Sequence, residues 1–311
     1  MRSAKSRVCP GLFILLPLLF LYGSCTSYEE EEKNLPDTYK RGTIHISADE
    51  SFKPIIDAQV QVYESNHPGT RIIVQYKPEA ECLKDFAVDS IRMIIATRGF
   101  TESEGNFMID SMKVSPSKMT VAKDAIAVIV NPLSQDSLFT MQELKQILTG
   151  KFTKKLNPVF DGVKATSTVR FIVDSVLKTD SLSAATTAAR TSEGVIDYVA
   201  KNPDAIGFIG VSWIGNKEDT IQMGFLKKVK MGFLESTDKP GGYVLPYQAN
   251  IYTKRYPMVR DLVYILKENH KGLGTAFADF LSGEIGQLIF KRAYLVPDKK
   301  NFLIRSARLR E

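Results

Sequence analysis

The sequence predicts an α/β protein, because strand-like and helix-like patterns alternate along most of its length. Residues 125–131 (AIAVIVN) form a nearly continuous apolar run, which is typical of a strand covered on both faces. Residues 141–149 then follow helical spacing and end at Gly150, a residue type that often terminates helices. We therefore expect mainly parallel strands with helices packed against the sheet.

The remaining elements are predicted in chain order from the same two periodicities. Runs rich in β-branched and other apolar residues predict strands at residues 43–47, 71–76, 90–96, 205–213, 226–234 and 243–253. Helical spacing predicts a helix that begins near Pro54, helices at residues 167–178 and 191–200, and three closing helices at residues 256–269, 273–282 and 284–293. Ser51, and either Thr166 or Ser167, are suited to cap two of these helices.

The first 24 residues are expected to be a secretory signal peptide. Three basic residues precede an apolar run at residues 12–22, which is too short to cross a bilayer because a membrane helix needs ~20 residues. The small residues just before Cys25 resemble a bacterial lipobox, in which this cysteine is acylated and becomes the mature N-terminus. A plain signal peptide with a chance cysteine is the alternative.

Residues 25–40 are predicted to be an acidic tether between the lipid and the folded domain. Four consecutive glutamates at residues 29–32 cannot be buried, so this segment is solvated. An acidic run after a lipidated cysteine also resembles the surface-export signal of lipoproteins in the Bacteroidetes lineage. We therefore expect a membrane attachment through the lipid, in the periplasm or on the outer-membrane surface of a Gram-negative bacterium.

Charge and cysteine content exclude several classes of function. The formal net charge is +6, but three of the positive charges lie in the leader, so no nucleic-acid-binding surface is expected. Cys82 is left alone once Cys9 is removed and Cys25 is acylated, so no intramolecular disulfide can form, and Cys82 is expected to be half-buried. No zinc-site, P-loop or nucleophile-elbow motif is present. We expect no metal, no cofactor and no catalysis.

Three polar turns lie next to predicted strands or helices and carry the candidate binding chemistry. They are Asp49-Glu50-Ser51-Phe52, Thr97-Arg98, and Thr166-Ser167-Thr168 with Arg170 nearby. Each turn combines hydroxyl groups with exposed backbone amides, and two add a guanidinium, a combination that suits a tetrahedral oxyanion. Each turn alone could be a simple helix cap. Their convergence in one cleft is the prediction.

Several segments resemble the phosphate-binding, PstS-like lipoproteins of ABC transporters, and the resemblance spans nearly the whole mature chain. The matching segments are ISADESFKP (46–54), IIATRGFTESE (94–104), AKDAIAVIVNP (122–132), LKQILTGK (144–151), TSTVR (166–170), the stretch 194–211, YPMVR (256–260) and FLSGEIGQLIFKRAYLVP (280–297). This family has a type II periplasmic-binding-protein fold, in which two α/β domains are joined by a two-crossing hinge. The resemblance implies one lobe from residues 41–118 plus 246–311 and a second from residues 119–245.

The resemblance also implies which residues contact the ligand. The family's anion contacts map onto Ser51 and Phe52, onto Thr97 and Arg98, and onto the turn at Thr166, Ser167 and Thr168, with Arg170 close by. The chain departs from the family where it lacks the glycine of that last turn. It also lacks an arginine that some members place just before the turn, for which Lys164 is a partial substitute.

The first of these turns also carries Asp49 and Glu50 where small residues are usual in the family. A carboxylate there, or Asp124, could accept the proton that phosphate carries and sulfate lacks. Alternatively, Asp124 caps its strand and the other two carboxylates face solvent.

The expected function is therefore that of a monomeric, non-catalytic lipoprotein that binds inorganic phosphate and delivers it to ABC permease subunits. The alternatives are a surface lipoprotein of the same fold that acts in adhesion or sensing, and a protein that binds another oxyanion or small solute.

Overall fold

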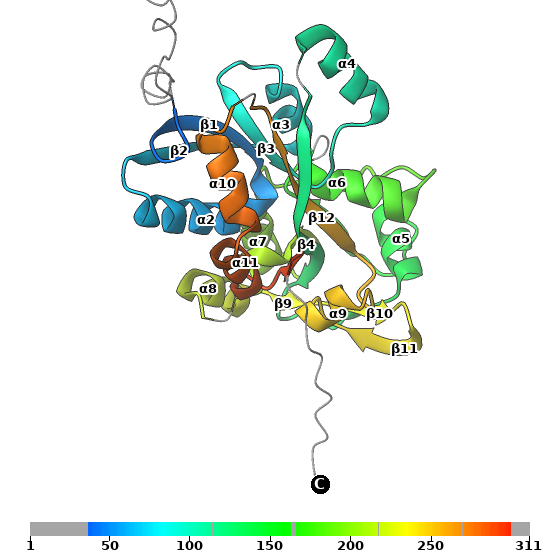
Figure 1. Cartoon of the computed structure of the whole chain (residues 1–311). Helices are drawn as coiled ribbons and strands as arrows, with labels where there is room; N and C mark the ends of the chain where they lie inside the picture. The colour runs from blue at the N-terminus through cyan, green and yellow to red at the C-terminus, as the bar shows by residue number, and fades with distance from the viewer. Residues whose placement is uncertain (1–36, 114, 163–165, 217, 269, 300–311) are drawn as a thin grey trace, which may run out of the picture.

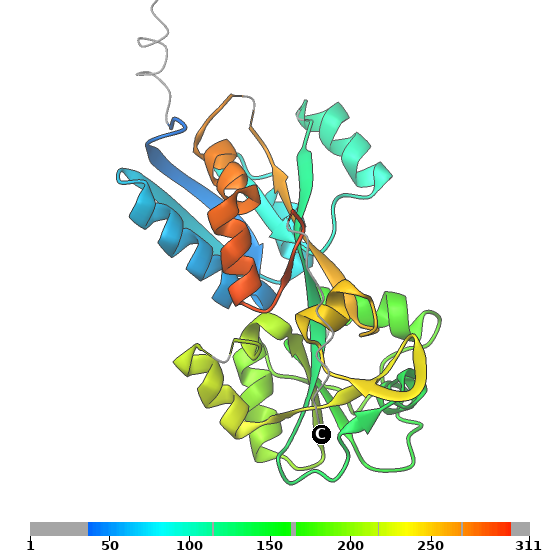
Figure 2. The ribbon, with the colours of Figure 1, turned by 60° about the horizontal axis from the view of Figure 1, so that its bottom comes forward.

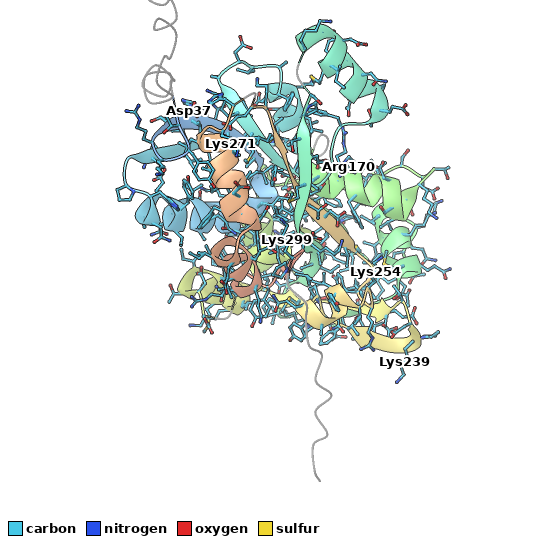
Figure 3. The ribbon with its side chains drawn as sticks, in the orientation of Figure 1. Asp37, Arg170, Lys239, Lys254, Lys271 and Lys299 are labelled. Carbon is cyan, nitrogen blue, oxygen red and sulfur yellow. The ribbon has the colours of Figure 1, made fainter. Side chains whose placement is uncertain are left out.

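The computed structural model describes residues 37–299, apart from residues 114, 163–165, 217 and 269 (Figure 1). Asp37 and Lys299, at the two ends of this range, are labelled in Figure 3. The predicted leader, Cys25 and most of the acidic tether lie outside the described residues, as does Lys164. Within the described part of the chain, no helix combines the length and apolar character that a membrane span requires.

One half of the molecule, which we call lobe I, is built on strands in the order β2-β1-β3-β12-β4. Strand β1 runs parallel to β2 and β3, whereas β12 is antiparallel to β3 and β4. The bounds are β1 Gly42–Asp49, β2 Thr70–Lys77, β3 Ile91–Ala96, β4 Ser117–Val130 and β12 Val259–Leu266.

Helices cover both faces of this part of the sheet. On one face α2 (Lys53–Asn66), α10 (Leu273–Ser282) and α11 (Glu284–Arg292) lie side by side (Figures 1 and 2). On the other, α3 (Glu79–Asp85) packs its buried Cys82 and Leu83 against β3. Helix α4 (Glu102–Met112) projects from the body of the molecule (Figure 1).

The other half, lobe II, is built on the far end of β4 and on strands β8, β6 and β7. Strand β8 (Ala205–Gly210) is antiparallel to β4, while β6 (Asn157–Phe160) is parallel to β8 and to β7 (Thr187–Ala188). Its helices are α5 Met141–Thr149, α6 Ser167–Phe171, α7 Ser192–Lys201, α8 Thr220–Lys228 and α9 Gln248–Tyr252. The short strands β9 Lys230–Met231 and β13 Val296–Pro297 also pair with β4, and β5 Leu138–Phe139, β10 Phe233–Ser236 and β11 Lys239–Val244 form a separate small sheet.

Strand β4 joins the two lobes. Its residues 117–125 pair with β12 in lobe I, and its residues 126–130 pair with β8 in lobe II. The arrangement confirms the predicted α/β class and the two-lobed fold. The predicted domain division, with a boundary between residues 118 and 119, stays a prediction; that position lies near the start of β4.

Several predicted elements agree with the structure to within a residue or two. Helices α5 and α10 have the predicted bounds, and α11 ends one residue early. The predicted helix at residues 167–178 is divided into α6 and a π-helical turn, Ile172–Leu177. The predicted strand at residues 205–213 ends at Gly210, and a 3-10 turn, Val211–Trp213, follows.

One predicted element is wrong in type, and two are strands over only part of their predicted length. The predicted helix at residues 256–269 is strand β12, an interior strand of the sheet between β3 and β4, and its residues 262–266 are buried on both faces. The predicted strand at residues 226–234 begins inside α8, whose start is capped by the Asp219 carboxylate. The predicted strand at residues 243–253 ends at Val244, and α9 follows. Cys82, expected to be half-buried, has no exposed surface.

Candidate functional site

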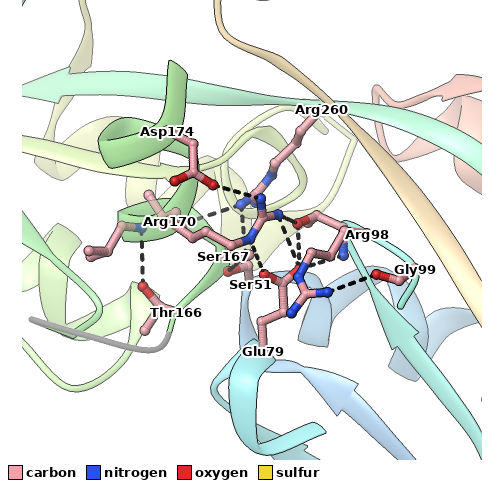
Figure 4. A network of polar contacts seen from close by, with 12 residues as sticks. Ser51, Glu79, Arg98, Gly99, Thr166, Ser167, Arg170, Asp174 and Arg260 are labelled. Atoms are coloured by element: carbon pink, nitrogen blue, oxygen red, sulfur yellow. Dashed lines mark hydrogen bonds and ion pairs between the residues drawn. The ribbon is translucent and has the colours of Figure 1, made fainter. Parts of the chain in front are cut away.

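Two of the three predicted polar turns meet between the lobes. The Ser51 hydroxyl, from lobe I, lies 3.3 Å from the Ser167 hydroxyl, from lobe II (Figure 4). Neither side chain has exposed surface. The predicted convergence of these two turns is therefore present in the structure, and it is a contact across the lobes.

The end of β1 positions Ser51. Asp49 is the last residue of β1, and its carboxylate accepts a hydrogen bond of 3.0 Å from the Ser51 amide, which starts a 3-10 turn (Glu50–Phe52) before α2. Lobe II then holds the same residue from the other side. The Trp213 indole Nε1 donates to the Ser51 carbonyl oxygen at 2.9 Å, and the Asp161 carboxylate accepts from the Ser51 hydroxyl at 3.3 Å.

The start of α6 positions the hydroxyls of lobe II. Thr166 is the cap, because its hydroxyl accepts a hydrogen bond of 3.2 Å from the Val169 amide. Ser167 and Thr168 are then the first two residues of the helix, and both are fully buried. Of the two caps that the sequence left open, Thr166 is therefore the one used.

Arg260 is the charged centre of this site, and it was not predicted as a site residue. Its Nη1 donates to the hydroxyls of Ser167 at 2.9 Å and Thr168 at 3.4 Å, and its Nε donates to Asp124 at 2.8 Å. Its guanidinium carbon lies 4.9 Å from the centre of the Phe52 ring. Because residues 256–269 were predicted as a helix, Arg260 had no predicted place at the start of a strand. The β-branched and aromatic run that follows it was the missed signal.

The carboxylates around Arg260 are buried and outnumber it. Asp49, Asp124 and Asp161 each have one oxygen that finds no hydrogen-bond partner among the described residues. Burial raises the pKa of Asp49 to about 7, although the Arg260 charge opposes the shift. Burial also raises the pKa values of Asp124 and Asp161. The Arg260 charge opposes the shift for Asp124, and a hydrogen bond with Thr166 and then the Arg260 charge oppose it for Asp161. The site therefore contains one carboxyl group, that of Asp49, whose pKa lies near neutral pH, and two more whose pKa values are raised.

Asp49 and Glu50 were expected to face solvent if neither accepts a ligand proton, and the structure contradicts this for Asp49 and in part for Glu50. Asp49 is 1% exposed. Glu50 is partly buried, and its carboxylate accepts from the amide and hydroxyl of Ser192, the first residue of α7 in lobe II. Burial raises the pKa of Glu50 to about 7, with a smaller contribution from the nearby Asp161. Asp161, at the end of β6, was missed by the sequence analysis.

The third predicted turn is connected to the site through a carboxylate. The amide and hydroxyl of Thr97 both donate to Glu79, and the Arg170 guanidinium donates to Glu79 and to the Thr97 hydroxyl (Figure 4). Glu79 was not predicted as a site residue. Thr97 and Arg170, predicted to contact the same ligand, thus come together across the lobes.

Arg98 donates its hydrogen bonds to Glu104 and Gly99 and not to the other predicted site residues that the structure describes. Its guanidinium donates to both carboxylate oxygens of Glu104, at 2.7 and 3.1 Å, and to the Gly99 carbonyl (Figure 4). Hydrogen bonds from Arg98 hold the pKa of Glu104 down to about 2. A contact between Arg98 and a ligand stays a prediction, and it would require this guanidinium to leave Glu104.

Metal binding has no support in the part of the chain that the structure describes. There, no group of three or more His, Cys, Asp or Glu side chains is arranged to hold a metal ion. The three histidines belong to different regions: His45 is in β1, His67 stacks on Tyr63, and His270 lies before α10.

Similar solved structures share the fold over most of this chain. A protein from Clostridium perfringens, assigned as a phosphate ABC transporter substrate-binding protein and solved with bound phosphate, has a TM-score of 0.70 at 21% identity, over 83% of this chain and 100% of that chain. An ABC-type phosphate transport receptor from Vibrio cholerae has a TM-score of 0.60 at 19% identity, over 81% and 99%. PstS from Borrelia burgdorferi has a TM-score of 0.51 at 18% identity, over 82% and 98%.

Sequence comparison adds the family. No curated protein matches the chain. A family model for the PBP superfamily domain matches residues 36–284, which is most of the chain. The chain therefore belongs to the PBP superfamily, whose two-lobed α/β fold it has.

Proposed function

We propose that this protein binds inorganic phosphate between its two lobes and delivers it to the membrane subunits of an ABC permease. The ligand lies beside Ser51 and Phe52 of lobe I and beside Ser167 and Thr168 of lobe II. Thr166 orders the second turn, and Thr97 and Arg170 flank the site. Arg260, on the strand next to β4, supplies the central positive charge.

The observation that carries this proposal is that the Arg260 guanidinium is buried and has one donor nitrogen without a partner within the residues that the structure describes. The residue is 5% exposed, and its Nη2 has no hydrogen-bond partner among the described residues. A buried donor on a charged group is costly to leave unpaired, so the site is built to receive an acceptor at this atom. The hydroxyls that surround Nη1 come from the second lobe, and the Ser51 hydroxyl comes from the first. An oxyanion there would receive donors from both lobes.

The buried carboxylates support phosphate over sulfate. Asp49, Asp124 and Asp161 each have an oxygen without a partner in the described part of the chain. An ionised carboxylate accepts hydrogen bonds and cannot donate them. Phosphate carries a proton near neutral pH that one of these oxygens can accept when its carboxyl group is ionised, whereas sulfate has no proton to donate to an ionised carboxylate. Glu50 is a weaker candidate for this role because Ser192 already donates to it.

The structural comparisons support the same ligand and the same role. The similar protein from Clostridium perfringens was solved with bound phosphate, and the one from Vibrio cholerae is a phosphate transport receptor. A ligand held by both lobes favours the closed form by the difference between its affinities for the closed and open forms. The closed, phosphate-loaded form is then the form that a permease can recognise.

The remaining parts of the proposal come from the sequence. The protein is a non-catalytic monomer that requires no cofactor and is anchored through Cys25, after removal of residues 1–24, on the periplasmic side or on the outer-membrane surface. An adhesion or sensing role without a ligand is not favoured, because such a role gives no reason for a buried arginine between hydroxyls of both lobes. Binding of a different oxyanion is the remaining alternative, and affinities for several anions distinguish it from phosphate binding.

Isothermal titration calorimetry of the purified protein with phosphate, sulfate and molybdate tests the proposal. We expect phosphate to bind with at least tenfold higher affinity than sulfate, and Ser167→Ala to weaken phosphate binding about tenfold or more, since a hydrogen bond to a charged group contributes about 1.5–3 kcal/mol. Equal binding of sulfate and phosphate would contradict the proton-acceptor role. No binding of any of the three anions would contradict the proposed function.

A further inference from the structure

Glu79 and Arg170 form an ion pair that crosses between the lobes near the candidate site. Glu79 is the first residue of α3 in lobe I and is 2% exposed. Arg170 is on α6 in lobe II, and its Nε lies 2.6 Å from Glu79 Oε2. Figure 4 shows this pair beside Ser51 and Ser167.

The Glu79 carboxylate is held as a ligand anion would be held. Its Oε1 accepts from the Thr97 amide at 2.8 Å, from the Thr97 hydroxyl and from Arg170 Nη2 at 3.4 Å. Burial alone would raise the pKa of Glu79, but hydrogen bonds from Arg170 and Thr97 outweigh it and lower that pKa. An amide, a hydroxyl and a guanidinium from two lobes therefore already bind an oxyanion, and this oxyanion belongs to the chain.

The pair exists only when the lobes are together. Thr97 and Glu79 are both in lobe I, so their hydrogen bonds survive any separation of the lobes. Arg170 moves with α6 in lobe II, so its bonds to Glu79 and Thr97 break when the lobes part. Charge-assisted hydrogen bonds of this kind are among the stronger polar contacts, so they bias the protein towards the closed form.

We propose that Glu79 is a positioning residue that holds the lobes closed through Arg170 before a ligand arrives, and thereby sets the ligand affinity without touching the ligand. The expected effect on phosphate affinity rests on the proposed function. The closure of the lobes by Glu79 and Arg170 does not depend on it. An anion that binds only the closed form has an apparent dissociation constant inversely proportional to the closed fraction. Weakening the pair lowers that fraction and therefore weakens binding.

The chain offers a matched control in a second Glu–Arg pair. Glu104 and Arg98 make two charged hydrogen bonds, as Glu79 and Arg170 do, but both residues are in lobe I. Glu104→Gln therefore removes an ion pair beside the site without removing a contact between the lobes. Arg170→Met is the second test variant, because it breaks the same interlobe pair from the other side and changes a partly exposed residue.

Small-angle X-ray scattering of the ligand-free proteins is the primary measurement. We expect the wild type and Glu104→Gln to share one compact radius of gyration, and Glu79→Gln and Arg170→Met to share a larger one. Calorimetry should show phosphate binding about tenfold weaker for Glu79→Gln and little changed for Glu104→Gln. Thermal unfolding establishes that each variant is folded.

Two outcomes would overturn the proposal. One is a ligand-free wild type as expanded as the two interlobe variants. The other is an equal expansion in Glu104→Gln. If the wild type is compact and both variants expand but no protein binds phosphate, the interlobe role of Glu79 stands and the proposed function fails. If Glu79→Gln does not fold, the scattering of Arg170→Met decides the question.

Discussion

Arg260 and Asp124 face each other on neighbouring antiparallel strands and form an ion pair that is almost completely buried. They are partners in the register of β12 and β4, and the side chains are 3% and 0% exposed. The pair lies one residue before β4 leaves β12, since Ala125 is the last β4 residue that pairs with that strand. The charge at the centre of the candidate site is therefore attached to the connection between the lobes.

Replacement of Arg260 should destabilise the protein as well as abolish phosphate binding. Arg260→Gln leaves Asp124 buried without its charged partner, and breaking such a pair from one side costs about 3–5 kcal/mol of the free energy of unfolding. Urea denaturation measures this loss. The double variant Arg260→Gln/Asp124→Asn should recover most of it, because no unpaired charge remains. An unchanged stability of the single variant would show that Asp124 is not ionised in the folded protein.

Phosphate affinity should distinguish Ser167 from Arg98. Ser167 lies between Ser51 and Arg260, so Ser167→Ala removes a hydroxyl from the centre of the site. Arg98 donates to Glu104 instead, so Arg98→Ala should weaken binding less than Ser167→Ala does. Calorimetry on both variants provides the comparison. A larger effect of Arg98→Ala would restore the direct ligand contact that the sequence predicts for it.

Gly210 should tolerate no side chain next to the ligand. A Cβ at this position would lie 3.1 Å from Arg260 Nη2 and 3.2 Å from the Ser51 carbonyl oxygen. Its φ of −63° is accessible to alanine, so the conflict is one of space and not of backbone conformation. We expect Gly210→Ala to weaken phosphate binding at least tenfold, with stability changed by only about 1 kcal/mol.

A second glycine provides the control for that prediction. A Cβ at Gly224, inside α8, would meet no atom within 4 Å. Gly224→Ala should therefore raise the free energy of unfolding by about 0.5–1 kcal/mol through helix propensity and leave phosphate affinity unchanged. If both alanine variants bind phosphate as the wild type does, the ligand does not lie beside Gly210.

Stability should decrease as the pH rises from about 4 to 7. The pKa of Asp49 is raised from its ordinary value of 3.8 to about 7, so in this window the folded state keeps a proton that the unfolded state has released. Proton binding by the folded state favours folding, and this advantage disappears as the pH passes the raised pKa. Glu50, whose pKa is also raised to about 7, contributes in the same direction.

Asp49→Asn tests this pH dependence. Asparagine keeps an oxygen that can accept from the Ser51 amide, but it does not titrate. We expect the loss of unfolding free energy between pH 5 and pH 8 to be smaller in the variant by about 1–3 kcal/mol. Denaturant titrations at the two pH values measure it. Equal losses in both proteins would mean that Asp49 is ionised throughout this range.

Local signals explain which elements could be predicted from the sequence. Helix α5 has the predicted bounds because Thr140 and Glu143 form a capping box at its start and Gly150 adopts a φ of 72° at its end. The turns at Ser51 and Ser167 were found for the same reason: hydroxyls beside a helix start are visible within a few residues. Their convergence was inferred, in part, from a family resemblance.

Non-local contacts explain what the sequence analysis missed. Strand β12 pairs with β3 and β4, which are distant in the sequence, and its short apolar run could not by periodicity alone be told from a buried helix. Arg260 was lost with it. Glu79 and Asp161 act through partners 91 and 110 positions away, Arg170 and Ser51, and a sequence pattern does not show contacts of that range.

The contact between Trp213 and Ser51 gives the molecule an intrinsic optical reporter. Trp213 is the single tryptophan of the sequence, and its indole donates to the Ser51 carbonyl oxygen from the opposite lobe. The ring is 6% exposed in this arrangement. Separation of the lobes would break that bond and admit solvent to the indole, which shifts tryptophan emission to longer wavelengths. Fluorescence of the unlabelled protein can therefore follow lobe movement in real time.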